Sequence, residues 1–174
     1  MERATRVAPS VLFGWLAQAI GRVMAWYARL VAATARITGA LTGEQAVLVF
    51  WHEFNLTAVA VMLARRGEVR HVSFSTRGFR GLVITSLLGA LGVRAISLPD
   101  EGADRAEARA LTVAMANLAD EGFSLAVTPD GPFGPYRAAK PGAAIVARAT
   151  GLPIVPLAFR VRPELRLPRR WESS

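Results

Sequence analysis

Short runs of consecutive apolar residues alternate with helix-like segments along most of the chain. The strand-like runs cover residues 46–50, 70–74, 94–97, 124–128 and 153–159. Between them lie helix-like segments at residues 54–66, 80–91, 104–121 and 141–150. In the third of these, Leu111, Met115 and Leu118 recur at the spacing of one helix face. The alternation predicts a single α/β domain with a mostly parallel central sheet flanked by helices.

The first 43 residues follow a different pattern. The stretch from Val7 to Gly21 is apolar and uncharged, but its 15 residues fall short of the about 20 that a membrane span needs. More apolar residues follow, and three arginines recur every seven residues, at Arg22, Arg29 and Arg36. Aromatic side chains suited to a membrane interface stand at Trp15, Trp26 and Tyr27.

We interpret residues 10–38 as a helix or helix pair lying in the bilayer surface. Residues 1–43 would then form a membrane-associating segment, and residues 44–174 the α/β domain. Two alternatives remain for this segment. The helix could pack on the domain's own core with its arginines facing water, or it could be a true span interrupted by Arg22.

Charge and hydrophobicity narrow the choice of partner. The 174 residues carry a formal charge of +8, and 52% of them are hydrophobic. A basic chain favours anionic partners, and the added hydrophobicity favours a membrane surface over nucleic acid. The aromatic residues also form no base-stacking platform. We therefore expect membrane lipid as a partner and no nucleic acid, while the oligomeric state stays open.

Missing residues and motifs exclude several kinds of chemistry. The chain has no cysteine and only two histidines, His52 and His71, which excludes disulfides and thiolate nucleophiles and disfavours a metal site. It also lacks a Gly-x-Ser-x-Gly elbow, a P-loop, a Gly-x-Gly-x-x-Gly after the first strand and a His-Glu-x-x-His pair. We expect neither a metal nor a cofactor.

One histidine stands where catalysis is favoured. His52 follows the first strand-like run and Trp51, and it precedes a helix-like segment. Ligands bind at the carboxyl ends of the strands in parallel α/β sheets, and an imidazole is well suited to act as a general base near neutral pH. A histidine in this place can also be a capping or packing residue, so position alone leaves both roles open. We interpret His71 as a structural or surface residue.

The loop after the fourth strand-like run is the second candidate segment. Five of the residues 129–135 are Pro or Gly, and such a loop fixes backbone angles and exposes N–H groups. Asp130 lies at its centre, and Arg137 and Lys140 follow it. A carboxylate held in a rigid turn beside two cations suits a phosphate-bearing or acyl-thioester ligand. A rigid connector with solvated charges is the alternative.

Together these segments resemble the lysophospholipid acyltransferase-like superfamily, and in particular its bacterial branch. The resemblance rests on Trp51-His52, on Thr128-Pro-Asp-Gly-Pro-Phe-Gly-Pro135, on Lys140-Pro-Gly142 and on Gly151-Leu-Pro-Ile-Val-Pro156. These motifs occur in the family's order and spacing between about residues 44 and 160. The Asp-Gly-Pro loop is the more specific motif, because the histidine alone is common.

The resemblance implies an O-acyltransferase. His52 would take a proton from an acceptor hydroxyl, which attacks an acyl thioester carried by acyl-CoA or acyl carrier protein. Asp130 is implied as a second catalytic residue. Substrate-binding roles are implied for Trp51, Thr128, Gly131, Pro132, Gly134, Arg137 and Lys140, with Arg137 and Lys140 providing charge for a phosphate. The protein would work peripherally on the cytoplasmic side of the inner membrane, and the acceptor and the acyl chain length stay open.

Four positions depart from the motifs. The wider superfamily has an acidic residue five positions after the histidine to orient the imidazole, and here that residue is Thr57. Glu53, next to the base, is expected to point elsewhere. The other departures are Arg80 for an aspartate, Ser97-Leu-Pro-Asp100 for an Arg-Gly-Ser stretch, and Phe133 for an arginine. The alternative function is therefore a catalytically weakened member of the fold that binds lipid or a partner, and an unrelated membrane scaffold comes third.

Overall fold

The strand-like runs pair into one parallel sheet of five strands in the order β3-β2-β4-β1-β5. The computed structural model describes residues 11–38, 43–65, 70–98, 105–131 and 134–162. The strands are β1 (Val47–Val49), β2 (Arg70–Ser75), β3 (Arg94–Ser97), β4 (Phe123–Val127) and β5 (Ile154–Pro156). All strand pairs are parallel. The predicted α/β class and the parallel sheet are confirmed.

Each strand is followed or preceded by a helix near the position that the sequence predicts. The helices are α1 (Val11–Thr34), α2 (Asn55–Ala64), α3 (Gly78–Ala90), α4 (Arg105–Asp120) and α5 (Gly142–Thr150), with a short 3-10 helix η1 (His52–Phe54) before α2. The run at 153–159 forms a shorter strand than expected. Pro156 in β5 has no N–H to donate, and β5 lies at the sheet edge, where proline is tolerated.

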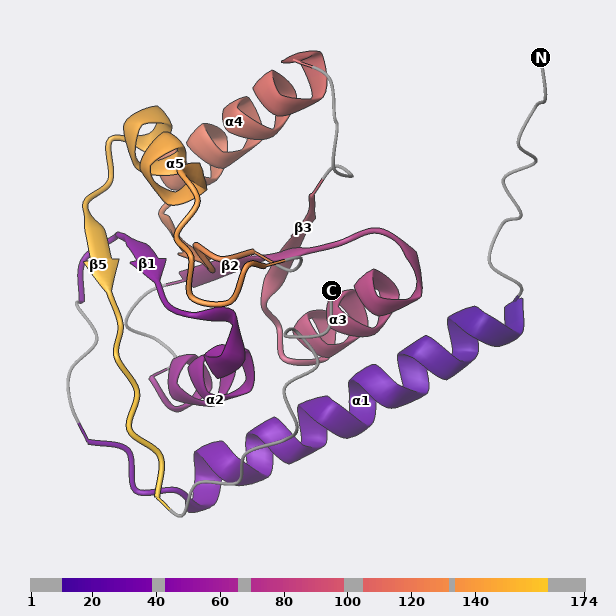
Figure 1. Cartoon of the computed structure of the whole chain (residues 1–174). Coiled ribbons are helices and arrows are strands. Elements are labelled where there is room, and N and C mark those ends of the chain that lie inside the picture. Colours follow the sequence, from indigo (N-terminus) through magenta and orange to yellow (C-terminus); the bar gives the residue numbers. More distant parts are fainter. Residues whose placement is uncertain (1–10, 39–42, 66–69, 99–104, 132–133, 163–174) are drawn as a thin grey trace, which may run out of the picture.

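Helices cover both faces of the sheet (Figure 1). On one face Val47, Val72 and Leu125 form a core with α4 and α5. Met115 and Leu118 of α4 are buried in this core and Leu111 packs against it, so the predicted stripe does face the core. On the other face Leu48 and Ala126 pack against Ala58 and Met62 of α2. The domain therefore has a three-layer α/β/α arrangement.

Helix α1 forms an additional layer outside α2 and α3 (Figure 1). Its buried residues are small and share one helix face: Ala17, Gly21, Ala25 and Ala28. At Gly21 a Cβ atom would lie only 2.7 Å from the carbonyl oxygen of Val83 in α3, so a side chain there would force the helices apart. Phe13 contacts Phe79 near the start of α3, and Arg29 donates to the carbonyl of Ala90 at its end. The two helices thus run side by side in the same direction.

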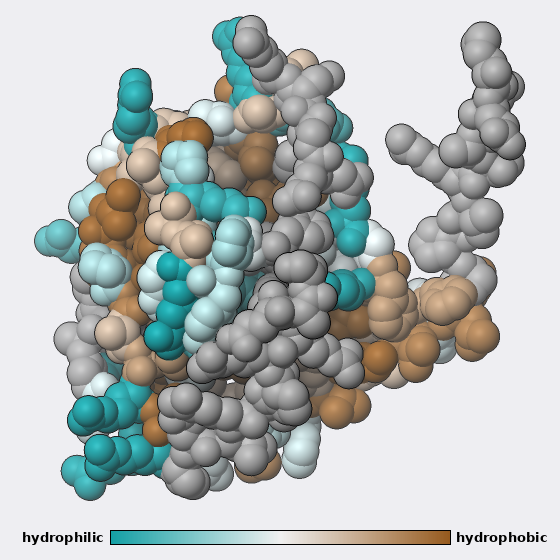
Figure 2. Space-filling model, in the orientation of Figure 1, coloured by the Kyte–Doolittle hydropathy of each residue, from teal (hydrophilic) through white to brown (hydrophobic). Residues whose placement is uncertain are grey.

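The side of α1 that faces away from the domain is exposed and mostly apolar. The large side chains that form this apolar face of α1 are Val11, Leu12, Phe13, Trp15, Leu16, Ile20, Val23, Trp26, Tyr27 and Leu30. Figure 2 shows hydrophobic residues gathered on the half of α1 that holds its N-terminus. Arg22 and Arg29 are exposed, whereas Arg36 lies beyond Thr34, where the helix ends. The helix therefore packs on the domain through small residues and turns its large ones outward.

The structure answers only part of the prediction for residues 10–38, namely whether they form one helix or two. Residues 10–38 were expected to hold one helix or two, and α1 is one continuous helix. Within the described ranges, no helix is long and apolar enough to cross a membrane.

Candidate active site

The site lies where β1 and β4 end at the same edge of the sheet. These strands are neighbours, with Val49 paired to Val127, and Phe50 donates to the carbonyl of Val127 one step further. His52 and Asp130 each come three residues after this last pair. Two segments distant in the sequence therefore leave the sheet side by side.

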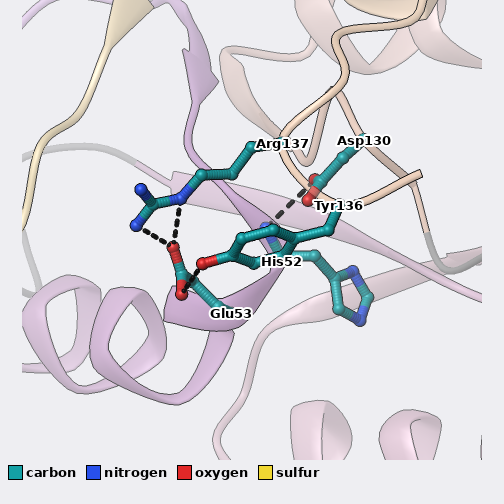
Figure 3. A network of polar contacts seen from close by, with 5 residues as sticks. All are labelled: His52, Glu53, Asp130, Tyr136 and Arg137. Carbon is teal, nitrogen blue, oxygen red and sulfur yellow. Dashed lines mark hydrogen bonds and ion pairs between the residues drawn. The ribbon is translucent and has the colours of Figure 1, made fainter. Parts of the chain in front are cut away.

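Asp130 holds the backbone of the histidine. Asp130 is only 3% exposed, and its Oδ1 accepts a hydrogen bond from the main-chain N–H of His52 at 3.1 Å (Figure 3). A buried carboxylate needs such donors, because an unpaired buried charge is costly. The resemblance implies a catalytic role for Asp130. In the structure, its carboxylate holds the backbone at the start of η1.

Thr128 contacts the imidazole itself. Its hydroxyl oxygen lies 3.4 Å from Nδ1 of His52. If Nδ1 carries the proton and donates to this oxygen, Nε2 is left unprotonated and able to accept a proton. Thr57, at the position of the superfamily's orienting acid, makes no side-chain hydrogen bond within the described residues. Thr128, which directly follows β4, therefore contacts the imidazole, whereas Thr57 of α2 does not.

Burial is the main influence on the acidity of His52. It lowers the pKa of the imidazole below its ordinary value of 6.5, because the charged form is disfavoured away from water. The negative charge of Asp130 raises this pKa and the positive charge of Arg80 lowers it, and both effects are smaller than that of burial. His52 is consequently neutral at pH 7, as a general base must be.

Stability should fall as the pH drops below 6.5. Burial lowers the pKa of His71 as well as that of His52, so between these lowered values and 6.5 the unfolded chain binds more protons than the folded one. We therefore expect the free energy of unfolding in urea to decrease from about pH 7.5 to about pH 5.5. The decrease should be smaller in the double variant His52→Gln, His71→Gln. An equal decrease in both proteins would contradict the assignment to the histidines.

The loop after β4 is fixed by its own backbone. Gly131 and Gly134 have φ angles of 65° and 72°, a region that side chains rarely adopt. The N–H of Gly131 donates to the carbonyl of Thr128 at 3.1 Å, and that of Lys140 donates to the carbonyl of Pro129 at 2.8 Å. These two hydrogen bonds lie on either side of Asp130 in the sequence of the loop and fix the position of its backbone. Pro132 and Phe133 lie outside the described residues.

Glu53 clamps the far end of this loop. Its Oε1 accepts from Nε of Arg137 at 2.8 Å and its Oε2 accepts from the hydroxyl of Tyr136 at 2.7 Å (Figure 3). Arg137 also has a positive φ of 53°, which is unusual for a residue with a side chain. Glu53 does point away from the imidazole, as expected. Glu53 therefore occupies the guanidinium of Arg137, the group that the resemblance implied would bind a phosphate.

Removing this clamp should loosen the loop without unfolding the protein. Arg137 is 51% exposed, and exposed ion pairs contribute at most about 1 kcal/mol. In Glu53→Gln we expect the amide of Lys140 to exchange with solvent up to roughly fivefold faster, with a small change in melting temperature. Glu121→Gln removes the comparable pair with Arg94 and serves as the control. Unchanged exchange at Lys140 in Glu53→Gln would rule out the clamp.

The structure also places the remaining candidate residues. Trp51 precedes η1 and is half-buried. The Nζ atom of Lys140 lies 3.8 Å from the position that a Cβ on Gly131 would take, so this cation stands beside the loop. Arg80, one of the departures from the family motifs, is close enough to His52 to affect its pKa. Ser97 is exposed at the end of β3, the strand at the edge beyond β2.

Sequence reasoning missed three roles in this site. They are the contact of Thr128 with the imidazole, the clamp by Glu53 and Tyr136, and the proximity of Arg80. All three depend on which strands are neighbours in the sheet. The order β2-β4-β1 brings them together, and no local pattern encodes that order. The one available signal was that Glu53 and Arg137 each border a motif and carry opposite charges.

Among the residues that the structure describes, no three His, Cys, Asp or Glu side chains could together hold a metal ion. No significant match to this chain was found among models of protein families, curated proteins or solved structures. The geometry of the site and the residues themselves must therefore carry the functional argument.

Proposed function

We propose that the protein is an O-acyltransferase that moves a fatty acyl group from an acyl thioester to a hydroxyl of a lipid acceptor such as a lysophospholipid. The observation that supports this most is the placement of His52. Burial lowers the pKa of its imidazole, its backbone is held by Asp130, and Thr128 lies next to Nδ1. A base positioned in this way at the carboxyl ends of parallel strands suits proton removal from a hydroxyl.

The proposed reaction needs one base and no covalent enzyme intermediate. Nε2 of His52 takes the proton as the acceptor oxygen forms a bond to the thioester carbonyl carbon. The C–S bond then breaks, and the imidazolium returns the proton to the leaving thiolate of acyl-CoA or acyl carrier protein. Bringing both substrates to the base supplies much of the rate acceleration.

The apolar face of α1 supports a membrane location for this chemistry. The side chains of Trp15 and Trp26 are 71% and 64% exposed, and Arg22 and Arg29 project from the same helix. A helix with exposed aromatic and aliphatic side chains and flanking cations suits the interface of an anionic bilayer. We propose peripheral attachment of α1 to the cytoplasmic side of the inner membrane, where acyl chains reach the site.

Acyl transfer by the purified wild-type protein tests the proposal. Labelled acyl-CoA and acyl carrier protein are each offered with lysophosphatidic acid and with monoacylglycerol, and esterified products are separated and counted. We expect a labelled product with at least one donor and acceptor pair. If no pair gives product above a heat-inactivated control, the acyltransferase proposal is wrong.

The alternative is a protein of this fold that binds lipid without turnover. The observation that favours it is the contact of the uncharged Thr128 side chain with the imidazole. A threonine hydroxyl stabilises an imidazolium less than a carboxylate would, because it carries no negative charge. Lipid binding without transfer by the wild type would support this alternative.

A further inference from the structure

Two cationic side chains near the site have no hydrogen-bond or ion-pair partner among the described residues: Arg80, which is close to His52, and Lys140, which lies beside Gly131 of the loop. Both are exposed. Arg137, in contrast, is paired with Glu53. The charge available to an incoming ligand therefore lies on Arg80 and Lys140.

The fold places Arg80 at the same sheet edge as the histidine. It stands in the first turn of α3, which follows the carboxyl end of β2, and β2 is the neighbour of β4. A Cβ on Gly81 would lie 1.6 Å from the carbonyl oxygen of Thr76, so the turn between β2 and α3 is tightly packed. On the other side of Arg80, the ring of Phe79 packs edge-on against Phe13 of α1. These contacts fix the backbone that carries Arg80.

The carboxylates of the site do not balance this positive charge. Asp130 is buried against the N–H of His52, and Glu53 is engaged by Arg137 and Tyr136. A cation near a general base weakens that base, since it disfavours the protonated imidazole. Such a cost is offset if the cation meets an anion of the substrate, and guanidinium and ammonium groups both bind phosphate well.

We propose that Arg80 and Lys140 bind a phosphate group of the substrate, and that Arg137 holds the loop instead of contacting this phosphate. The inference rests on the proposed function, because the phosphate belongs to one of the two reactants. It comes either from the head group of the acceptor lipid or from the coenzyme A part of the donor. Arg80 thus selects phosphate-bearing over neutral substrates.

Binding to the full chain tests this without requiring turnover. The probes are octanoyl lysophosphatidic acid, mono-octanoylglycerol and free coenzyme A, each measured by titration calorimetry with wild type, Arg80→Gln and Arg80→Lys. Arg109→Gln is the matched control, because Arg109 is an exposed arginine of α4 on the other face of the sheet. The pKa of His52, followed by NMR, should rise in Arg80→Gln if the fold is intact.

We expect Arg80→Gln to weaken one phosphate probe by about tenfold or more and to change mono-octanoylglycerol binding by less than about twofold. Arg80→Lys should restore part of the loss. Weakened lysophosphatidic acid binding identifies the acceptor as the source of the phosphate, and weakened coenzyme A binding identifies the donor. The proposal is overturned if the wild type binds neither phosphate probe, or if Arg80→Gln binds both as tightly as Arg109→Gln does. A wild type that binds phosphate through Arg80 but transfers no acyl group refutes only the proposed function.

Discussion

His52→Ala should lower acyl transfer by at least about 100-fold, since a positioned general base contributes roughly 10²- to 10⁴-fold to a rate. The loss should appear mainly in kcat, because the imidazole acts on the proton as the new bond forms, whereas the loop and the cations proposed to bind the substrate remain in place. Steady-state rates with saturating donor and acceptor measure this. His52→Gln, which keeps a polar side chain of similar size, should be about as inactive.

His71→Gln is the control for this experiment. His71 is also partly buried in the sheet and its pKa is also lowered by burial, but it lies near the start of β2, away from the carboxyl ends of the strands. Its replacement should leave kcat within about twofold of wild type. In the wild type, the rate should fall on the acid side with a midpoint below 6.5, because burial lowers the pKa of His52 from that value. Equal rates of acyl transfer in wild type and His52→Ala would contradict the proposal that His52 is the general base of an acyltransferase.

Replacing two side chains of the apolar face of α1 should release the protein from membranes. Leu12 and Val23 are 76% and 65% exposed and point away from the small residues that pack on α3. Burying an aliphatic side chain contributes about 1.5–3 kcal/mol. Leu12→Asn with Val23→Asn should therefore weaken binding to vesicles that contain phosphatidylglycerol by about 100-fold. Co-sedimentation over a range of lipid concentrations measures the effect.

The matched control replaces two exposed aliphatic side chains elsewhere. Val113 of α4 and Ile145 of α5 are 52% and 53% exposed and lie across the sheet from α1. Val113→Asn with Ile145→Asn should bind vesicles as the wild type does. Higher salt should weaken binding of all three proteins if Arg22 and Arg29 contact anionic lipid. Equal vesicle binding by the two double variants would show that α1 is not the docking surface.

The local elements of this protein could be read from the sequence. Strand and helix identity depend on the period of apolar residues within short windows, and a turn rich in proline and glycine needs no distant partner to be recognised. For this reason the five strands and the helices between them were predicted near their observed positions. The stripe of Met115 and Leu118 was also predicted correctly. The placement of His52 and of Asp130 directly after strands was also predicted, whereas their proximity depends on β1 and β4 being neighbours in the sheet.

The tertiary structure alone decided how these residues are used. Thr128 reaches the imidazole, and Glu53 reaches Arg137 across 84 residues of chain, because β4 lies next to β1 in the sheet. Arg80 joins the site because β2 lies on the other side of β4. In α1, the small residues face α3 and the large ones face outward, although both kinds are hydrophobic by sequence. Local periodicity specifies an element, but pairing order and the facing of one helix on another depend on contacts between distant segments, which no short window of sequence contains.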